Sequence, residues 1–130
     1  MNEEVKALVE YRMQQARDAR EEAEILFERG KYRGALNRVY YSMFYAVLAL
    51  LASRELTASK HSGVIYLFHR EFVKTEMIPL DVAKFLDIAF DLRNKCDYRD
   101  FVTPDFQRVA ELLKQSEVFI DTVKATLERH

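Results

Sequence analysis

The chain has 130 residues, and its 20 Lys and Arg residues nearly balance its 21 Asp and Glu residues, for a net charge of −1 at pH 7. It contains no basic tail and no run of Lys and Arg, which argues against duplex DNA binding driven by overall charge. Three Gly and two Pro are too few for the frequent turns of a β-sandwich or β-barrel. We therefore expect residues 1–130 to form a single all-α domain.

Hydrophobic periodicity predicts a series of helices. In the first, from Glu3 to Arg29, apolar residues recur at steps of three and four, and Gly30 provides the stop signal. The second, from Tyr32 to Ser53, is apolar on nearly all its faces, which is typical of a helix at the centre of a bundle or beneath a second subunit. Its most apolar stretch, residues 40–52, is shorter than the ~20 residues of a membrane-spanning helix.

Two further helices are separated by a break in the apolar pattern. The third is expected from Ser59 to Val73, with Thr57 or Ser59 as its N-cap. Pro79 lies in the break, and the fourth helix is expected from Asp81 to Cys96.

The last helix has the clearest start signal. Thr103 is the expected N-cap, Pro104 suits the first turn, and Asp105 favours the positive end of the helix dipole. Its predicted buried face begins at Phe106.

Because the loops are short, sequential helices should be antiparallel neighbours. The expected fold class is an antiparallel up-and-down four-helix bundle with an additional short helix.

Several kinds of site can be set aside. The single cysteine, Cys96, cannot form an intrachain disulfide, which favours a reduced, cytoplasmic setting. No Glu-x-x-His pair, zinc pattern or Gly-rich phosphate loop is present. We therefore expect no metal site and no cofactor.

A stripe of polar side chains accompanies Arg38 on the second helix. Asn37, Arg38, Tyr41 and Tyr45 share one face at steps of about four residues. A charge enclosed in so apolar a helix must be paired. Arg38 either pairs with a carboxylate from a neighbouring helix or lines a binding site, and the sequence leaves both open.

Two other polar segments are candidates for a site. His61, in Lys60–Gly63, lies at a helix start, where free backbone N–H groups favour an anion; the alternative is a capping or core histidine. Asp91–Asp100 is rich in polar side chains at the end of the fourth helix. Its alternative is a solvated helix end with an Asp91–Lys95 pair.

Three segments together resemble the HEPN domain, in particular its small stand-alone prokaryotic branch. They are Asn37–Ala46, Lys60–Val64 and Arg93–Tyr98, and the last contains the Arg-x-x-x-Asp-Tyr motif of that branch. The resemblance covers nearly all of the chain. It implies an up-and-down helical bundle that forms a homodimer, with the fourth-helix motifs of the two subunits facing each other across a cleft.

The resemblance also implies a partner and an activity. Members of the family commonly act with a small nucleotidyltransferase as a toxin–antitoxin pair, and some are nucleotidylated on a tyrosine near this motif, which makes Tyr98 a candidate acceptor. Many are metal-independent RNases whose signature is Arg, four to six residues and then His. Arg93 and Asn94 match the first half of the signature, but Tyr98 stands where the shortest spacing would place His.

This departure changes the expected chemistry, because tyrosine, with a pKa of ~10, is a poor base at pH 7, whereas histidine can accept a proton there. We expect a module that binds a nucleotide or an RNA phosphate, with seven candidate residues: Arg93, Asn94, Asp97, Tyr98, Arg38, Tyr41 and His61. One alternative is an RNase that uses Arg93 with a substitute base, which could be His61 only if the fold brings it near Arg93. Another is a purely structural interaction bundle.

The aromatic residues of the second helix give a separate reason to expect a homodimer. A bundle of this size cannot readily hide Tyr40, Tyr41, Phe44 and Tyr45 together with the apolar stripe on the opposite face. Large exposed apolar patches usually mark an interface.

Overall fold

The computed structural model describes residues 1–99 and 102–129, and these residues form helices and connecting loops without a β-strand. The elements, in chain order, are α1 (Glu3–Glu28), α2 (Tyr32–Ser53), α3 (His61–Phe68), the π-helix η1 (His69–Val73), α4 (Leu80–Tyr98) and α5 (Phe106–Arg129). The predicted all-α fold class is confirmed. The predicted third helix is present as two consecutive elements, α3 and η1.

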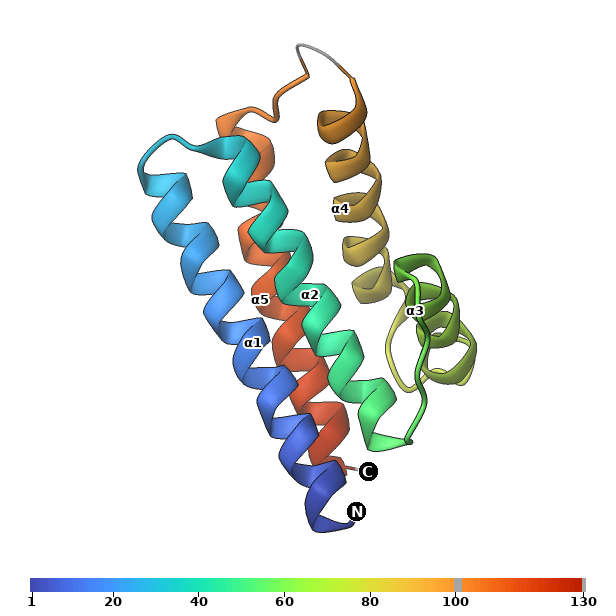
Figure 1. Cartoon of the computed structure of the whole chain (residues 1–130). Helices are drawn as coiled ribbons and strands as arrows, with labels where there is room; N and C mark the ends of the chain where they lie inside the picture. Colours follow the sequence, from blue (N-terminus) through green and yellow to red (C-terminus); the bar gives the residue numbers. More distant parts are fainter. Residues whose placement is uncertain (100–101, 130) are drawn as a thin grey trace.

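The four long helices run up and down along one another, while α3 and η1 pack on the side of the bundle next to α2 and α4 (Figure 1). The chain termini lie at one end of the bundle. The α1–α2 turn, the last turn of α4 and the first turn of α5 lie at the opposite end. Since α2 and α4 run in opposite directions, the end of α4 lies beside the first half of α2, and the polar motifs of these two helices can meet.

The central position of α2 follows from its sequence, which is apolar on nearly every face. It is long and apolar enough to span a membrane, but 72% of its most apolar 18-residue stretch is buried inside the bundle. That burial is the pattern of a core helix. The largest side chains of α2 that are fully buried include Tyr40, Leu36 and Met43.

The burial of α2 removes two of the four aromatic side chains from which we expected a homodimer. Tyr40 is fully buried and Phe44 is 5% exposed, while Tyr41 and Tyr45 are half-buried. One chain therefore covers Tyr40 and Phe44, and it leaves Tyr41 and Tyr45 partly exposed. The prediction was wrong for Tyr40 and Phe44 because α3 folds back along this side of α2 and places His61 against three of these rings.

Two predicted helix caps are wrong. α3 follows Lys60, which makes no side-chain capping hydrogen bond, and neither Thr57 nor Ser59 is its N-cap. α5 begins two residues later than predicted because the carboxylate of Asp105, rather than Thr103, accepts the N–H of Arg108 at 2.8 Å.

Phe106 was predicted to begin the buried face of the last helix, and this prediction is wrong. As the first residue of α5 it is 55% exposed, and its ring lies 4.9 Å from that of Phe27.

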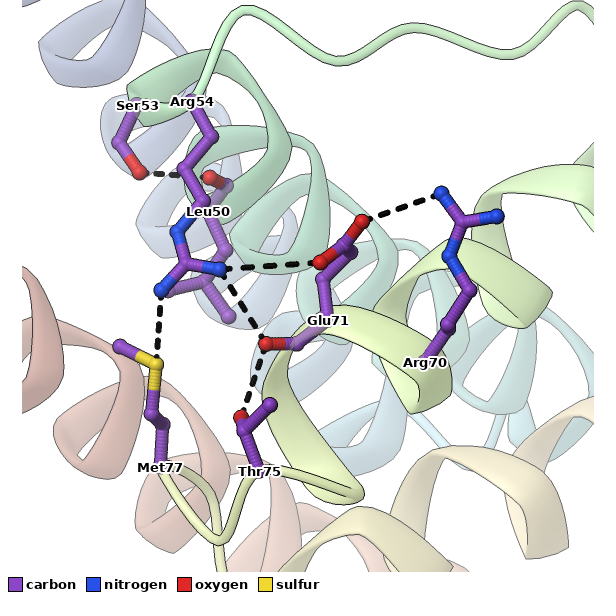
Figure 2. A network of polar contacts seen from close by, with 7 residues as sticks. All are labelled: Leu50, Ser53, Arg54, Arg70, Glu71, Thr75 and Met77. Atoms are coloured by element: carbon purple, nitrogen blue, oxygen red, sulfur yellow. Dashed lines mark hydrogen bonds and ion pairs between the residues drawn. The ribbon is translucent and has the colours of Figure 1, made fainter.

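A polar network around Arg54, the residue after α2, fastens η1 and the following loop to the end of α2 (Figure 2). Arg54 Nη1 donates to the backbone carbonyl of Glu71 at 3.3 Å, and Nη2 lies 2.9 Å from Met77 Sδ. The guanidinium lies 4.6 Å from the centre of the Phe72 ring. Thr75 donates to the same Glu71 carbonyl at 2.9 Å. Because α3 leads directly into η1, this network also helps to hold α3 against α2.

We expect the substitution Arg54→Ala to lower the free energy of unfolding by about 1–2 kcal/mol, since it removes a charged hydrogen bond and a cation–π contact. Urea denaturation followed by circular dichroism measures this value. The matched control is Lys84→Ala, because Lys84 is exposed on α4, and its effect should stay within about 0.5 kcal/mol. Equal stability of the two variants would show that the network contributes nothing.

Candidate functional site

The centre of the candidate site is Arg93, near the end of α4. Its guanidinium carbon lies 5.0 Å from the centre of the Tyr40 ring and 5.2 Å from that of Tyr41. Its side chain is 20% exposed. The helical repeat places Arg93 on the same side of α4 as the buried residues Ala89 and Cys96, so this side chain leaves the helix towards α2. A cation is thus held at the edge of the core by two aromatic rings.

Arg93 also has an acidic neighbour one turn further along α4. Its Nε lies 3.4 Å from Asp97 Oδ2, an ion pair that replaces the Asp91–Lys95 pair considered from the sequence. The Nε atom is buried and forms no hydrogen bond with the residues that the structure describes. An ion pair without a hydrogen bond, on a side chain in contact with water, holds the two groups weakly.

Arg38 also contacts Tyr41, with its guanidinium carbon 5.3 Å from the centre of the Tyr41 ring. Its Nε lies 3.4 Å from Glu22 Oε1 on α1, and its side chain is 29% exposed. The sequence left open a carboxylate partner for Arg38 from a neighbouring helix, and Glu22 is that partner. Because Arg38 and Arg93 both contact the Tyr41 ring, the structure brings two positive charges to one aromatic side chain.

His61 belongs to the same cluster. Its ring centre lies 4.3 Å from that of Phe44 and 5.7 Å from that of Tyr41. Its Nδ1 lies within hydrogen-bonding distance, 3.1 Å, of the Tyr40 hydroxyl. The sequence made a catalytic role for His61 conditional on its closeness to Arg93, and the fold brings both residues to the same tyrosines.

The ionisation of Tyr40 and His61 follows from their surroundings. Burial raises the pKa of Tyr40, and the positive charge of Arg93 offsets this only in part. Tyr40 therefore keeps its proton at neutral pH, and we infer that its hydroxyl donates a hydrogen bond to Nδ1 of His61. Burial lowers the pKa of His61, and the charge of Arg93 lowers it further. At pH 7 His61 is thus neutral, and we infer that its proton is on Nε2.

The remaining predicted residues lie at the margin of this cluster. Asn94 is half-buried, and Tyr98 is 85% exposed. Neither forms a hydrogen bond to Arg93, Tyr41 or His61 within the described part of the chain. They are accessible to a ligand but take no part in holding Arg93.

Two residues that contribute to the site were not predicted as site residues. Tyr40 was assigned to a subunit interface, although its position two residues after Arg38 and beside Tyr41 signals a place near the polar stripe. Glu22 gave no usable signal, because Glu21 and Glu24 are near it on the charged face of α1. Only the packing of α1 against α2 selects Glu22 as the partner of Arg38.

No group of three or more His, Cys, Asp or Glu side chains that could hold a metal ion is found in residues 1–99 and 102–129. The chemistry that the cluster offers is that of two guanidinium groups, a neutral imidazole N–H and tyrosine rings. Guanidinium groups form paired hydrogen bonds with phosphate oxygens, and aromatic rings can stack on bases.

The class of protein to which this helical bundle belongs follows from a match of its sequence to a known family. The sequence matches the HEPN domain over residues 9–126, and the chain therefore belongs to the HEPN family. This confirms the resemblance found from the three motifs.

Three relatives each match most of this chain. A "UPF0332 protein" of Thermotoga maritima is 37% identical over 128 residues, which are 98% of this chain and 96% of the relative. Two proteins of Methanocaldococcus jannaschii carry the name "Putative toxin". One is 33% identical over 128 residues, 98% of this chain and 92% of the relative. The other is 32% identical over 115 residues, 88% of this chain and 78% of the relative.

The hydrogen bond between Tyr40 and His61 can be tested with a double-mutant cycle. We expect His61→Phe to cost about 1–3 kcal/mol, because the buried Tyr40 hydroxyl loses its acceptor. The double variant with Tyr40→Phe should lose about 1 kcal/mol less free energy of unfolding than the two single variants lose together. Urea denaturation of the four proteins measures the coupling. Strictly additive effects would mean that this hydrogen bond does not stabilise the fold.

The lowered pKa of His61 predicts a specific dependence of stability on pH. Since the unfolded chain binds this proton at the ordinary histidine pKa of about 6.5 and the folded chain binds it only at a lower pH, the contribution to stability is complete above pH ~6.5 and is lost as pH falls through the folded-state pKa. Between pH 7.5 and 5 the wild type should therefore lose more stability than His61→Phe. Identical losses in the two proteins would contradict the assignment.

Proposed function

We propose that this HEPN protein binds phosphate groups of a nucleotide or an RNA strand with Arg93 and Arg38. The observation that carries the proposal is that both guanidinium groups lie against one ring, Tyr41. Each directs its Nε towards a carboxylate at 3.4 Å. In the described residues their terminal nitrogens form no hydrogen bond, so these nitrogens remain free to donate to a ligand.

The physical setting favours an anionic ligand. Two cations held close together repel each other, and an anion between them removes that cost. The aromatic rings limit the movement of the guanidinium groups, so less conformational freedom is lost on binding. The carboxylates of Asp97 and Glu22 compete only weakly, because half-exposed ion pairs contribute little free energy. Asn94 and His61 Nε2 would supply further N–H donors.

We further propose that the protein acts as a homodimer in the cytoplasm, beside a small nucleotidyltransferase, in a toxin–antitoxin-like pair. Family membership over residues 9–126 and the toxin names of two relatives support the general class. Residues 1–130 would act as one domain, and Cys96, which is buried, would stay reduced. Tyr98 is 85% exposed, which would make its hydroxyl accessible to a partner that nucleotidylates it.

A second candidate function is a metal-independent RNase that uses His61 as the base. The observation that favours it is the closeness of His61 to the tyrosines that hold Arg93. Tyr40 opposes it, because its hydroxyl donates to Nδ1 and so leaves the proton on Nε2. His61 could accept a proton from a 2′-hydroxyl only after this hydrogen bond is broken or reversed.

We expect Arg93→Ala to weaken binding of a uridine or adenosine nucleotide by about tenfold or more, since it removes a charged, paired hydrogen bond. Arg93→Lys should recover only part of the affinity, because an ammonium group lacks the planar pair of donors. Isothermal titration calorimetry measures both. The control is Arg17→Ala, since Arg17 is an exposed α1 residue that bonds to Gln14. Equal affinity of wild type and Arg93→Ala would refute the site.

The two candidate functions separate in a cleavage assay. Wild-type protein is incubated with single-stranded RNA and a metal chelator, beside Arg93→Ala and His61→Phe. Cleavage that both substitutions abolish would establish the RNase and replace the proposal of a binding module. Intact RNA with all three proteins, together with the loss of binding in Arg93→Ala, supports binding alone.

The proposed homodimer is tested by sedimentation at micromolar concentration. A monomer at that concentration would contradict it.

A further inference from the structure

A groove lies between the helical segment α3–η1 and the loop that leads into α4. We call it the η1 groove. Of the residues that the structure describes, nine line it, and none of these nine belongs to the candidate site. Leu80, which lines the groove, and Arg93 are 13 residues apart on α4, about 20 Å along the helix axis. The groove is therefore a separate region of the surface.

Hydrogen bonds hold the η1 groove in shape. The N–H of Glu76 donates to the carbonyl of Val73, and the N–H of Ile78 donates to that of Phe72, both at 2.9 Å, so the loop is folded against η1. His69 Nε2 lies 3.2 Å from Asp87 Oδ1, which ties η1 to α4. η1 is a π-helix, a rare conformation that is frequent at functional sites. Small-molecule sites are usually preformed in this way.

The surface of the η1 groove is mainly apolar. Ile78 is fully buried, Val73 is half-buried, and Leu80 and Tyr66 are 57% and 61% exposed. Arg70 lies with its guanidinium carbon 5.6 Å from the centre of the Tyr66 ring, which limits the movement of this ring. Exposed apolar side chains that share a concave surface are typical of a binding groove.

The charged groups around the η1 groove have an excess of positive charge. Glu71 lies between Arg54 and Arg70 (Figure 2), with its oxygens 3.9 Å from Arg54 Nη1 and 3.0 Å from Arg70 Nη2. One carboxylate is thus shared by two guanidinium groups. Lys74 is exposed and forms no ion pair with any residue that the structure describes. Glu76 is the one carboxylate among the described lining residues, so the charge balance favours an anion.

The size of the η1 groove favours a small molecule over a protein. Its volume is about 800 Å³, and small-molecule sites enclose about 300–1,000 Å³. A stable protein interface engages about 20–30 residues on each side, far more than the nine described residues that line this groove.

The geometry points to a second ligand site, in which the η1 groove binds a small organic acid. The apolar body of the acid lies on Val73, Ile78 and Leu80, and its carboxylate pairs with Lys74. The inference goes beyond the proposed function and does not depend on it, because it uses neither Arg93 nor the tyrosines that contact Arg93.

NMR titration of the ¹⁵N-labelled full chain tests this site. The probe is 1-naphthylacetate, and its matched compounds are the neutral 1-naphthylacetamide and the cationic 2-(1-naphthyl)ethylamine. We expect the acid to bind with a Kd of about 1 mM and to shift the amide signals of Tyr66, Val73 and Leu80. The neutral compound should bind about threefold more weakly, since an exposed ion pair contributes little free energy, and the cationic compound more weakly still.

Two substitutions separate the charge from the apolar contact. Lys74→Gln should weaken binding of 1-naphthylacetate about threefold and leave that of 1-naphthylacetamide unchanged. Leu80→Ser should weaken binding of both compounds about threefold or more, because it removes apolar surface from the groove. The matched controls, Lys6→Gln and Ile25→Ser, change exposed residues of α1 and should bind like the wild type. The same spectra verify that each variant is folded.

Four results would overturn the inference. Equal affinity for the three compounds would show that the groove does not select an anion. Signal shifts confined to Arg93 and Tyr41 would place the acid in the candidate site instead. No shift of the groove amides at about 5 mM probe would exclude a small-molecule site and leave the groove to a partner protein. Shifts of these amides with protein concentration, in the absence of probe, would assign the groove to a second copy of the chain.

Discussion

The contact on which the site depends is that of the Arg93 guanidinium with the rings of Tyr40 and Tyr41. A charge at the edge of an apolar core is costly unless its surroundings compensate for the lost water. Here two rings, the carboxylate of Asp97 and partial contact with water provide this compensation. Because Tyr40 is fully buried and α3 covers it through His61, the position of Arg93 is fixed by three helices together.

This contact also determines the chemistry that the neighbouring groups can perform. The charge of Arg93 disfavours a second positive charge, so it keeps His61 neutral and strengthens the tendency of Tyr40 to donate. With its proton on Nε2, as we infer from the contact with Tyr40, His61 offers a hydrogen-bond donor to a ligand. The same charge that would attract a phosphate thus keeps this histidine in its neutral form and makes it a weaker base than a histidine with an ordinary pKa.

The sequence was sufficient for the features that depend on local patterns, and insufficient for those that depend on packing. The helices and the central place of α2 follow from periodicity, and the three polar motifs pointed to the HEPN family. The choice of Asp105 over Thr103 as N-cap depends on local backbone geometry, which composition does not determine. The covering of the α2 aromatics by α3, and the pairing of Arg38 with Glu22, are contacts between distant segments.

The two parts of the proposed function, dimerisation and anion binding, are physically connected. If the ends of two α4 helices face each other across a cleft, four guanidinium groups from Arg93 and Arg38 of both subunits share one region. Their repulsion opposes the dimer unless carboxylates or a ligand neutralise it. Asp97 and Glu22 do so only in part, since their contacts with the arginines are 3.4 Å long and not hydrogen-bonded. A phosphate in such a cleft would remove the remaining repulsion, and ligand and second subunit would then strengthen each other's binding by the same factor.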